Sequence, residues 1–123
     1  MKKEELRIGN YVMYDNKVVY IAEILKEGVR IYDGWGFDKT TPYECIKPIV
    51  IDEVSLNKSE LKSYELGYYE LFDESEKCLN INIDGHVYLN GIHLAELNYI
   101  HEIQNLYYSI NKENLKFDYT DRF

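Results

Sequence analysis

Apolar and polar residues alternate in short runs along the first half of the chain, a pattern typical of half-buried β-strands. Four such runs lie at residues 8–14, 18–25, 29–32 and 43–51. A turn between the first two runs is expected at Asp15, Asn16 and Lys17. Because proline has no backbone N–H to donate, Pro48 places the last run at a sheet edge or at a bulge. Short strands this closely connected predict a small antiparallel barrel of the SH3-like kind, with an open meander as the alternative.

A short helix is expected after these strands. Residues 55–67 carry apolar side chains at helical spacing. Ser55 or Asn57 can cap the start of this helix, and Gly67 is placed to end it.

The strand pattern then returns in the second half of the chain. Four runs lie at residues 68–72, 78–83, 86–89 and 92–97, and a charged turn occupies residues 73–77. Asp84-Gly85 and Asn90-Gly91 are strong signals for two-residue hairpins. This half therefore predicts a four-stranded antiparallel meander.

The most regular apolar spacing lies near the C-terminal end. It predicts a helix over residues 98–111, whose apolar face is formed by Ile100, Ile103, Leu106, Tyr107 and Ile110. Asn98 can cap the start of this helix, and Asn111 can terminate it in a left-handed conformation. We expect the helix to pack on the second sheet, and residues 115–123 to add a strand or remain mobile.

Together these elements predict an α+β fold. An N-terminal SH3-like small antiparallel barrel is followed by the short helix, the antiparallel meander and the C-terminal amphipathic helix. The expected modules are residues 1–52 and 53–123, packed as one globular unit, since a chain of 123 residues has the size of a single domain.

Composition restricts the classes of partner. Tyrosine supplies 13 of the 18 aromatic residues, which suits half-buried strand positions or a contact surface. The net charge of −8 falls mostly on residues 53–123, with thirteen acidic and six basic residues. Lys2 and Lys3 form the one basic cluster, so we expect no generic nucleic-acid binding and favour a basic protein as partner.

The chain also carries signals of its environment. Its first residues lack the apolar core of a signal peptide, and no run of apolar residues reaches membrane-spanning length. Cys45 and Cys78 are far apart and have no metal-site spacing, so we expect two reduced, buried thiols. These features predict a cytoplasmic protein.

One histidine motif is excluded as a metal site. The sequence HEIQN begins at His101-Glu102 and places Asn105 where the helix of a zinc protease needs its second histidine.

A second histidine pattern surrounds the Asn90-Gly91 turn. A two-residue hairpin would oppose Tyr88 to His93, place His86 opposite residue 95, and make the two histidines diagonal neighbours. Such a pair can hold a divalent ion. More commonly, histidines at these positions are simply part of a row of aromatic and polar side chains on the solvent-exposed face of a sheet. With no positioned nucleophile and no phosphate-binding glycine loop, we expect no enzyme, no catalytic residue and no cofactor.

Four residues are candidates for protein contact. Trp35 lies on a glycine-flanked turn, where it either anchors a partner or plugs the open end of the barrel. His101, Asn105 and Tyr108 form a polar stripe beside the apolar face of the last helix. We favour a hydrogen-bonded seam against the sheet over a contact surface for this stripe.

Three segments carry a family resemblance. LRIGNYV at residues 6–12, IKPIVI at 46–51 and YIHEIQNLYYSINKENL at 99–115 resemble a family of small uncharacterised proteins of gut anaerobic bacteria and their phages or mobile elements. The match in the last segment rests on Tyr99, His101, Gln104, Asn105, Leu106 and Tyr107. The resemblance implies a small, phage-associated accessory protein and carries over no functional residue.

Three functions remain open on this basis. The favoured one is a non-enzymatic protein-binding or adaptor module, with a nucleic-acid mimic as a variant. The second is a structural protein that self-associates through strand edges or the terminal helix into a homo-oligomer. The third is a metal-binding protein or enzyme that uses His86 and His93.

Overall fold

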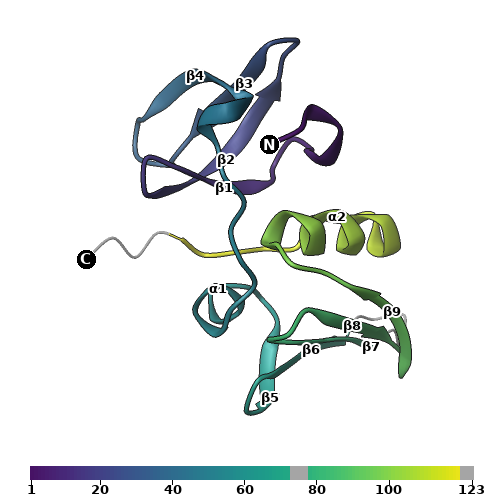
Figure 1. Cartoon of the computed structure of the whole chain (residues 1–123). Helices are drawn as coiled ribbons and strands as arrows, with labels where there is room; N and C mark the ends of the chain where they lie inside the picture. Colours follow the sequence, from purple (N-terminus) through teal and green to yellow (C-terminus); the bar gives the residue numbers. More distant parts are fainter. Residues whose placement is uncertain (73–77, 120–123) are drawn as a thin grey trace. The chain divides into compact units, whose positions relative to one another are not determined.

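The computed structural model describes residues 1–72 and 78–119, and the predicted turn at 73–77 lies outside them. The fold is α+β, with two antiparallel sheets and one main helix near the C-terminus (Figure 1). The chain forms two compact units. Unit 1 comprises Met1–Ile49 and Ile100–Asn114, and unit 2 comprises Val50–Tyr99 together with the segment that begins at Leu115.

Unit 1 contains a four-stranded sheet in the order β1-β2-β3-β4. Its strands are β1 (Tyr11–Tyr14), β2 (Lys17–Ile24), β3 (Gly28–Tyr32) and β4 (Asp38–Pro42). Asp15 and Asn16 both have positive φ, 47° and 62°, as a two-residue hairpin with the twist of its strands requires. The first three strands thus lie close to their predicted positions.

The predicted last strand of this sheet is corrected. Residues 43–51 form no strand, because Tyr43–Cys45 is a 3-10 helix and Lys47 makes an isolated bridge to Met13. The fourth strand is instead β4, whose Thr40 and Thr41 suit a strand although the segment has little apolar character. Neither sheet closes over the described residues, so an SH3-like barrel is not confirmed.

The core of unit 1 follows the strand alternation. Its buried apolar residues are Leu6, Val12, Val19, Ile21, Val29, Ile31 and Ile46. Successive side chains of a strand point to opposite faces, so Val19 and Ile21 enter the core while Val18 and Tyr20 face away.

Unit 2 contains a five-stranded sheet in the order β5-β6-β7-β8-β9. Its strands are β5 (Lys62–Glu65), β6 (Tyr68–Phe72), β7 (Cys78–Asn82), β8 (His86–Leu89) and β9 (Ile92–Glu96). Asn90 and Gly91 have φ of 51° and 83°, which confirms the hairpin turn between β8 and β9. The meander is therefore one strand longer than predicted.

The additional strand, β5, lies in the second half of the predicted helix over residues 55–67. The helix α1 spans Glu53–Asn57, and its cap is Asp52, whose side chain accepts a hydrogen bond from the backbone N–H of Ser55. Gly67, with φ of 80°, lies in the turn between β5 and β6 rather than at a helix end. The helix starts two residues earlier than predicted and ends at Asn57, so β5 is free to pair with β6.

The main helix α2 spans Ile100–Asn111, two residues shorter at its start than predicted. Lys112, with φ of 59°, takes the left-handed position that was assigned to Asn111. α2 belongs to unit 1, and the side chain of Gln104 joins it by hydrogen bonds to Gly9 and Tyr11. The sequence pattern assigned this helix to the second sheet and to the 53–123 module. In unit 2, Phe117 forms an isolated bridge with Ser59, and the described part of the tail, residues 115–119, forms no strand.

Candidate binding face of the second sheet

The five-stranded sheet has two chemically different faces. Tyr69, Leu79, Ile81 and Val87 are buried on one face. Their strand neighbours alternate to the other face, which we call the outer face of unit 2. It carries tyrosine, asparagine and histidine side chains from all five strands.

One row of directly opposed residues crosses the whole outer face. Lys62 pairs with Glu70, Glu70 with Asn80, Asn80 with Tyr88, and Tyr88 with His93. Opposed residues in an antiparallel sheet lie about 4.5–5.5 Å apart at Cβ, so their side chains form a continuous polar and aromatic surface.

A pocket of about 320 Å³ lies on this face. It is lined by Tyr64, Tyr68, Asn80, Ile81, Asn82, Tyr88 and Gly91. The rings of Tyr64 and Tyr68 lie 6.1 Å apart and are 48% and 42% exposed. Asn80 Nδ2 donates a hydrogen bond of 3.1 Å to the Tyr64 hydroxyl. The pocket therefore offers flat aromatic surface beside amide groups that can donate and accept hydrogen bonds.

The tyrosines of the first sheet are arranged differently. Tyr11, Tyr20 and Tyr32 are opposed across β1, β2 and β3. Their rings meet edge to face at centroid distances of 6.3 and 5.3 Å, and all three side chains are half-buried. These tyrosines stabilise the sheet through cross-strand packing, so tyrosine richness alone does not mark a binding face.

The net charge of the protein lies in unit 2. Among the described residues, unit 1 carries nine basic and ten acidic residues, whereas unit 2 carries three basic and eight acidic residues. Glu70 and Glu96 lie on the outer face itself, because their register partners do. The potential around this face therefore favours cations.

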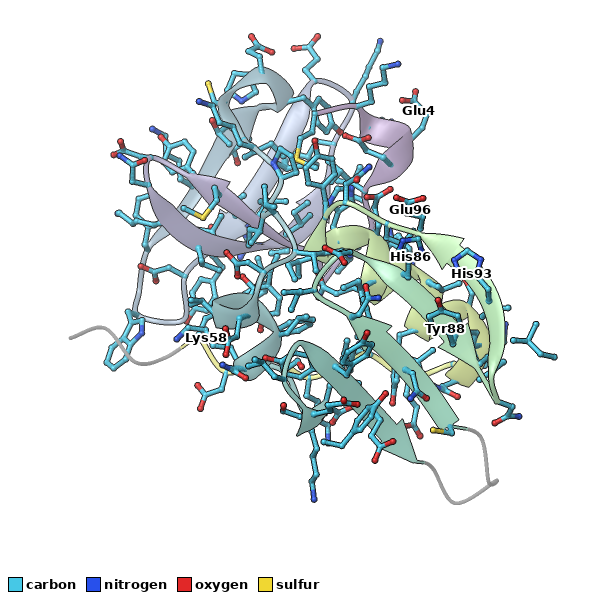
Figure 2. All side chains as sticks on the ribbon, turned by 60° about the horizontal axis from the view of Figure 1, so that its bottom comes forward. Glu4, Lys58, His86, Tyr88, His93 and Glu96 are labelled. Atoms are coloured by element: carbon cyan, nitrogen blue, oxygen red, sulfur yellow. The ribbon has the colours of Figure 1, made fainter. Side chains whose placement is uncertain are left out.

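His86 and His93 lie side by side on the β8–β9 hairpin (Figure 2). His86 Nδ1 is 3.2 Å from His93 Nε2, and the Tyr88 ring meets the His93 ring edge-on at 5.2 Å. The predicted pairing of Tyr88 with His93 is confirmed. A β-bulge shifts the register beyond it, so His86 opposes Glu96 and not residue 95 as predicted.

Trp35 lies on the loop between β3 and β4 in unit 1. Asp33 Oδ1 accepts hydrogen bonds from the backbone N–H groups of Trp35 and Phe37, which fixes the turn. The Trp35 side chain is 60% exposed, so it plugs no barrel end. Its role as a contact residue stays a prediction.

The polar stripe of α2 forms a seam within unit 1. Asn105 Oδ1 accepts a hydrogen bond of 2.9 Å from Asn10 Nδ2, and Asn105 Nδ2 donates to the carbonyl of Glu5. The Arg7 guanidinium lies 3.8 Å from the centroid of the Tyr108 ring. The seam thus joins α2 to the N-terminal segment of unit 1.

The pattern did not single out Gln104, which completes this seam. Its Oε1 accepts from the backbone N–H of Tyr11 at 2.8 Å, and its Nε2 donates to the Gly9 carbonyl at 3.1 Å. Gln104 is only 7% exposed, and a buried side-chain amide on a helix indicates a hydrogen-bonding role. Because burial cannot be read from the sequence, this signal was not available there.

His101 is the most deeply buried residue of the stripe, at 2% exposure. Burial lowers the pKa of its imidazole below the ordinary value, with Glu102 and Glu5 opposing the shift. The buried ring therefore offers no accessible contact surface.

The cysteines are unpaired but not buried as predicted. Cys45 is exposed and Cys78 is half-buried. Burial and the nearby Glu70 raise the pKa of the Cys78 thiol. Within residues 1–72 and 78–119, no three His, Cys, Asp or Glu side chains converge as a metal cluster, and no helix is long and apolar enough to cross a membrane.

Comparison of the chain with protein-family models, with characterised proteins and with solved structures finds no match.

Proposed function

We propose that this protein is a non-enzymatic protein-binding module that holds a basic, extended segment of a partner protein on the outer face of unit 2. The observation that carries the proposal is the tyrosine- and asparagine-lined pocket in a unit whose described residues include three basic and eight acidic ones. Charge complementarity selects a cationic partner, and the exposed rings provide the contact area.

The pocket chemistry suits arginine and lysine side chains. A guanidinium group stacks on tyrosine rings such as those of Tyr64 and Tyr68, and its donors can reach carboxylates such as Glu70. Asn80 and Asn82 can bond the backbone of an extended segment. Alternate side chains of such a segment point the same way, so every second residue would face the sheet.

Binding fits the pocket better than catalysis does. Its lining consists of tyrosine, asparagine, isoleucine and glycine, and it contains no carboxylate, histidine, serine or cysteine. General acid–base and nucleophilic catalysis rely mainly on the side chains that the lining lacks. This composition supports an adaptor role.

The predicted SH3-like first half, cytoplasmic location and phage context all fit a protein-binding module. The 3-10 helix after β4 and the bridge from Lys47 back to Met13 support an SH3-like course of the chain in unit 1. Unpaired cysteines suit a cytoplasmic location, and the family resemblance suggests a phage or mobile-element context. Trp35 would supply a second contact in this setting.

Site-specific photo-crosslinking tests the proposal. We replace Tyr68 with p-benzoylphenylalanine, irradiate the protein in host lysate, and identify the attached peptides by mass spectrometry. The expected products are segments rich in lysine and arginine, whose yield falls about tenfold with an added Tyr64→Ala change, since aromatic anchors dominate interface energy.

The matched control places the same photoreactive residue at Tyr32, in the tyrosine ladder of the first sheet. We expect few products there. Equal yields at the two positions, or attached segments without basic residues, would contradict the proposal.

A second candidate function is self-association through β9. This strand lies at the edge of the five-stranded sheet, and its Ile92 and Leu94 are 68% and 43% exposed. Exposed apolar edge strands are ready templates for pairing with another chain. Sedimentation equilibrium tests this function: a dimer that Leu94→Lys dissociates supports it, and a monomer at high concentration rejects it.

A further inference from the structure

We propose that His86 and His93 form a binding site for a divalent transition-metal ion, with zinc as the reference ligand. Their facing ring nitrogens, Nδ1 of His86 and Nε2 of His93, lie 3.2 Å apart on the solvent-facing side of the β8–β9 hairpin. This site is separate from the peptide-binding pocket, whose lining includes neither histidine.

The separation of the two nitrogens matches a shared metal. Two nitrogens bound to one tetrahedral zinc ion, each at about 2.0–2.1 Å, lie about 3.3 Å apart. The ring centroids are 5.3 Å apart and the ring planes are inclined by 48°. Without metal, one nitrogen donates a hydrogen bond to the other. With metal, rotation of the two rings directs both lone pairs at the ion while the backbone keeps its place.

The bulged register of the hairpin changes the residue that lies opposite His86. His86 opposes Glu96 rather than an alanine, so a carboxylate lies next to the histidine pair (Figure 2). A carboxylate beside a metal-bound imidazole can hold the ring in the tautomer that binds the ion. Tyr88 restrains the His93 ring from the other side.

The number of protein ligands determines the kind of site. No three ligating side chains already converge in the part of the chain that the structure describes, so water completes the coordination. Structural zinc sites use four protein ligands, and this site is therefore open and exchangeable. Imidazole favours zinc, nickel and copper over magnesium and calcium, which prefer oxygen ligands.

Isothermal titration calorimetry of the tag-free protein with zinc chloride tests the site. We expect one zinc ion per chain and at least about tenfold weaker binding in His86→Gln and in His93→Gln, because each change removes one of two imidazole ligands. Nickel should bind at the same site, whereas magnesium should not bind.

The control variant is Ile92→Ala, which changes an exposed residue next to His93 and removes no ligand. Its zinc affinity should equal that of the unmodified protein, and circular dichroism should show that all variants keep their fold. Absence of zinc binding at 100 µM metal, or unchanged affinity in both histidine variants, overturns the proposal. The His86→Gln and His93→Gln variants should still bind a basic peptide, so a failure of the metal site can be distinguished from a failure of the proposed function.

Discussion

The seam between α2 and the β1 region should be destabilised most by removal of Gln104. Its amide bridges two backbone groups that lie far from it in the sequence, the N–H of Tyr11 and the carbonyl of Gly9. The Gln104→Ala change deletes both hydrogen bonds at a site with 7% exposure and leaves both backbone groups without this partner.

The magnitude follows from these contacts. A hydrogen bond contributes about 1 kcal/mol net, and a buried group left without a partner costs about 1–3 kcal/mol. The two bonds together predict a loss of about 2–4 kcal/mol in the free energy of unfolding, a large fraction of the 5–15 kcal/mol typical of domains. Urea unfolding followed by the fluorescence of Trp35, the one tryptophan, reports on unit 1.

The control for this prediction is Ser109→Ala. Ser109 is exposed, and its hydroxyl donates to the Asn105 carbonyl one turn earlier in the same helix. Such a surface change should alter the free energy of unfolding by less than about 0.5 kcal/mol. If Gln104→Ala cost no more than this control, the hydrogen-bonded seam would not hold α2 in place.

Two further substitutions test the structure within each unit, Gly85→Ala in unit 2 and His101→Gln in unit 1. In Gly85→Ala, the added Cβ would lie 1.8 Å from the Leu97 carbonyl oxygen, at a φ of 89°. We expect Gly85→Ala to lower the free energy of unfolding by about 2–5 kcal/mol, measured by thermal melting. Gly91→Ala, at a residue with a similar φ but open space around it, should lower it by about 1–2 kcal/mol. Equal losses in the two variants would contradict the close approach of Gly85 to Leu97. Burial lowers the pKa of His101 in the folded state, so the unfolded state binds the proton more readily and stability should fall as the pH drops below about 6.5, by at most about 1.4 kcal/mol per pH unit. His101→Gln should weaken this pH dependence of the free energy of unfolding, measured by urea titrations at pH 5 to 8. If the pH dependence were unchanged in this variant, it would have to come from other titratable groups.

Local turn chemistry made much of the fold predictable. Asn90 and Gly91 can adopt positive φ, and β8 matches its predicted range while β9 begins where predicted and ends one residue earlier. The helix over 55–67 was wrong because its apolar spacing fits a short helix and a strand equally, and Asp52 competes successfully as the cap. β4 was missed because a polar edge strand carries little hydrophobic signal.

The candidate sites were less predictable, since they depend on contacts between distant residues. The stripe of α2 was recognised as a seam, yet its partner Asn10 lies 95 positions from Asn105. The contact between His86 and His93 followed from the hairpin, whereas the bulge that brings Glu96 opposite His86 left no trace in the pattern. Tyr64 was assigned to a helix, so its place beside Tyr68 could not be inferred.

The central claim is that the outer face of unit 2 binds a basic extended segment, and NMR titration tests it most directly. The probe is an eight-residue peptide that alternates arginine and threonine, and the control replaces each arginine with glutamate. We predict that only the arginine peptide shifts the backbone amide resonances of the pocket residues, among them Tyr68, Asn80 and Tyr88, and that added salt weakens the effect. Shifts confined to unit 1, equal shifts with both peptides, or no shifts at millimolar peptide would contradict the claim.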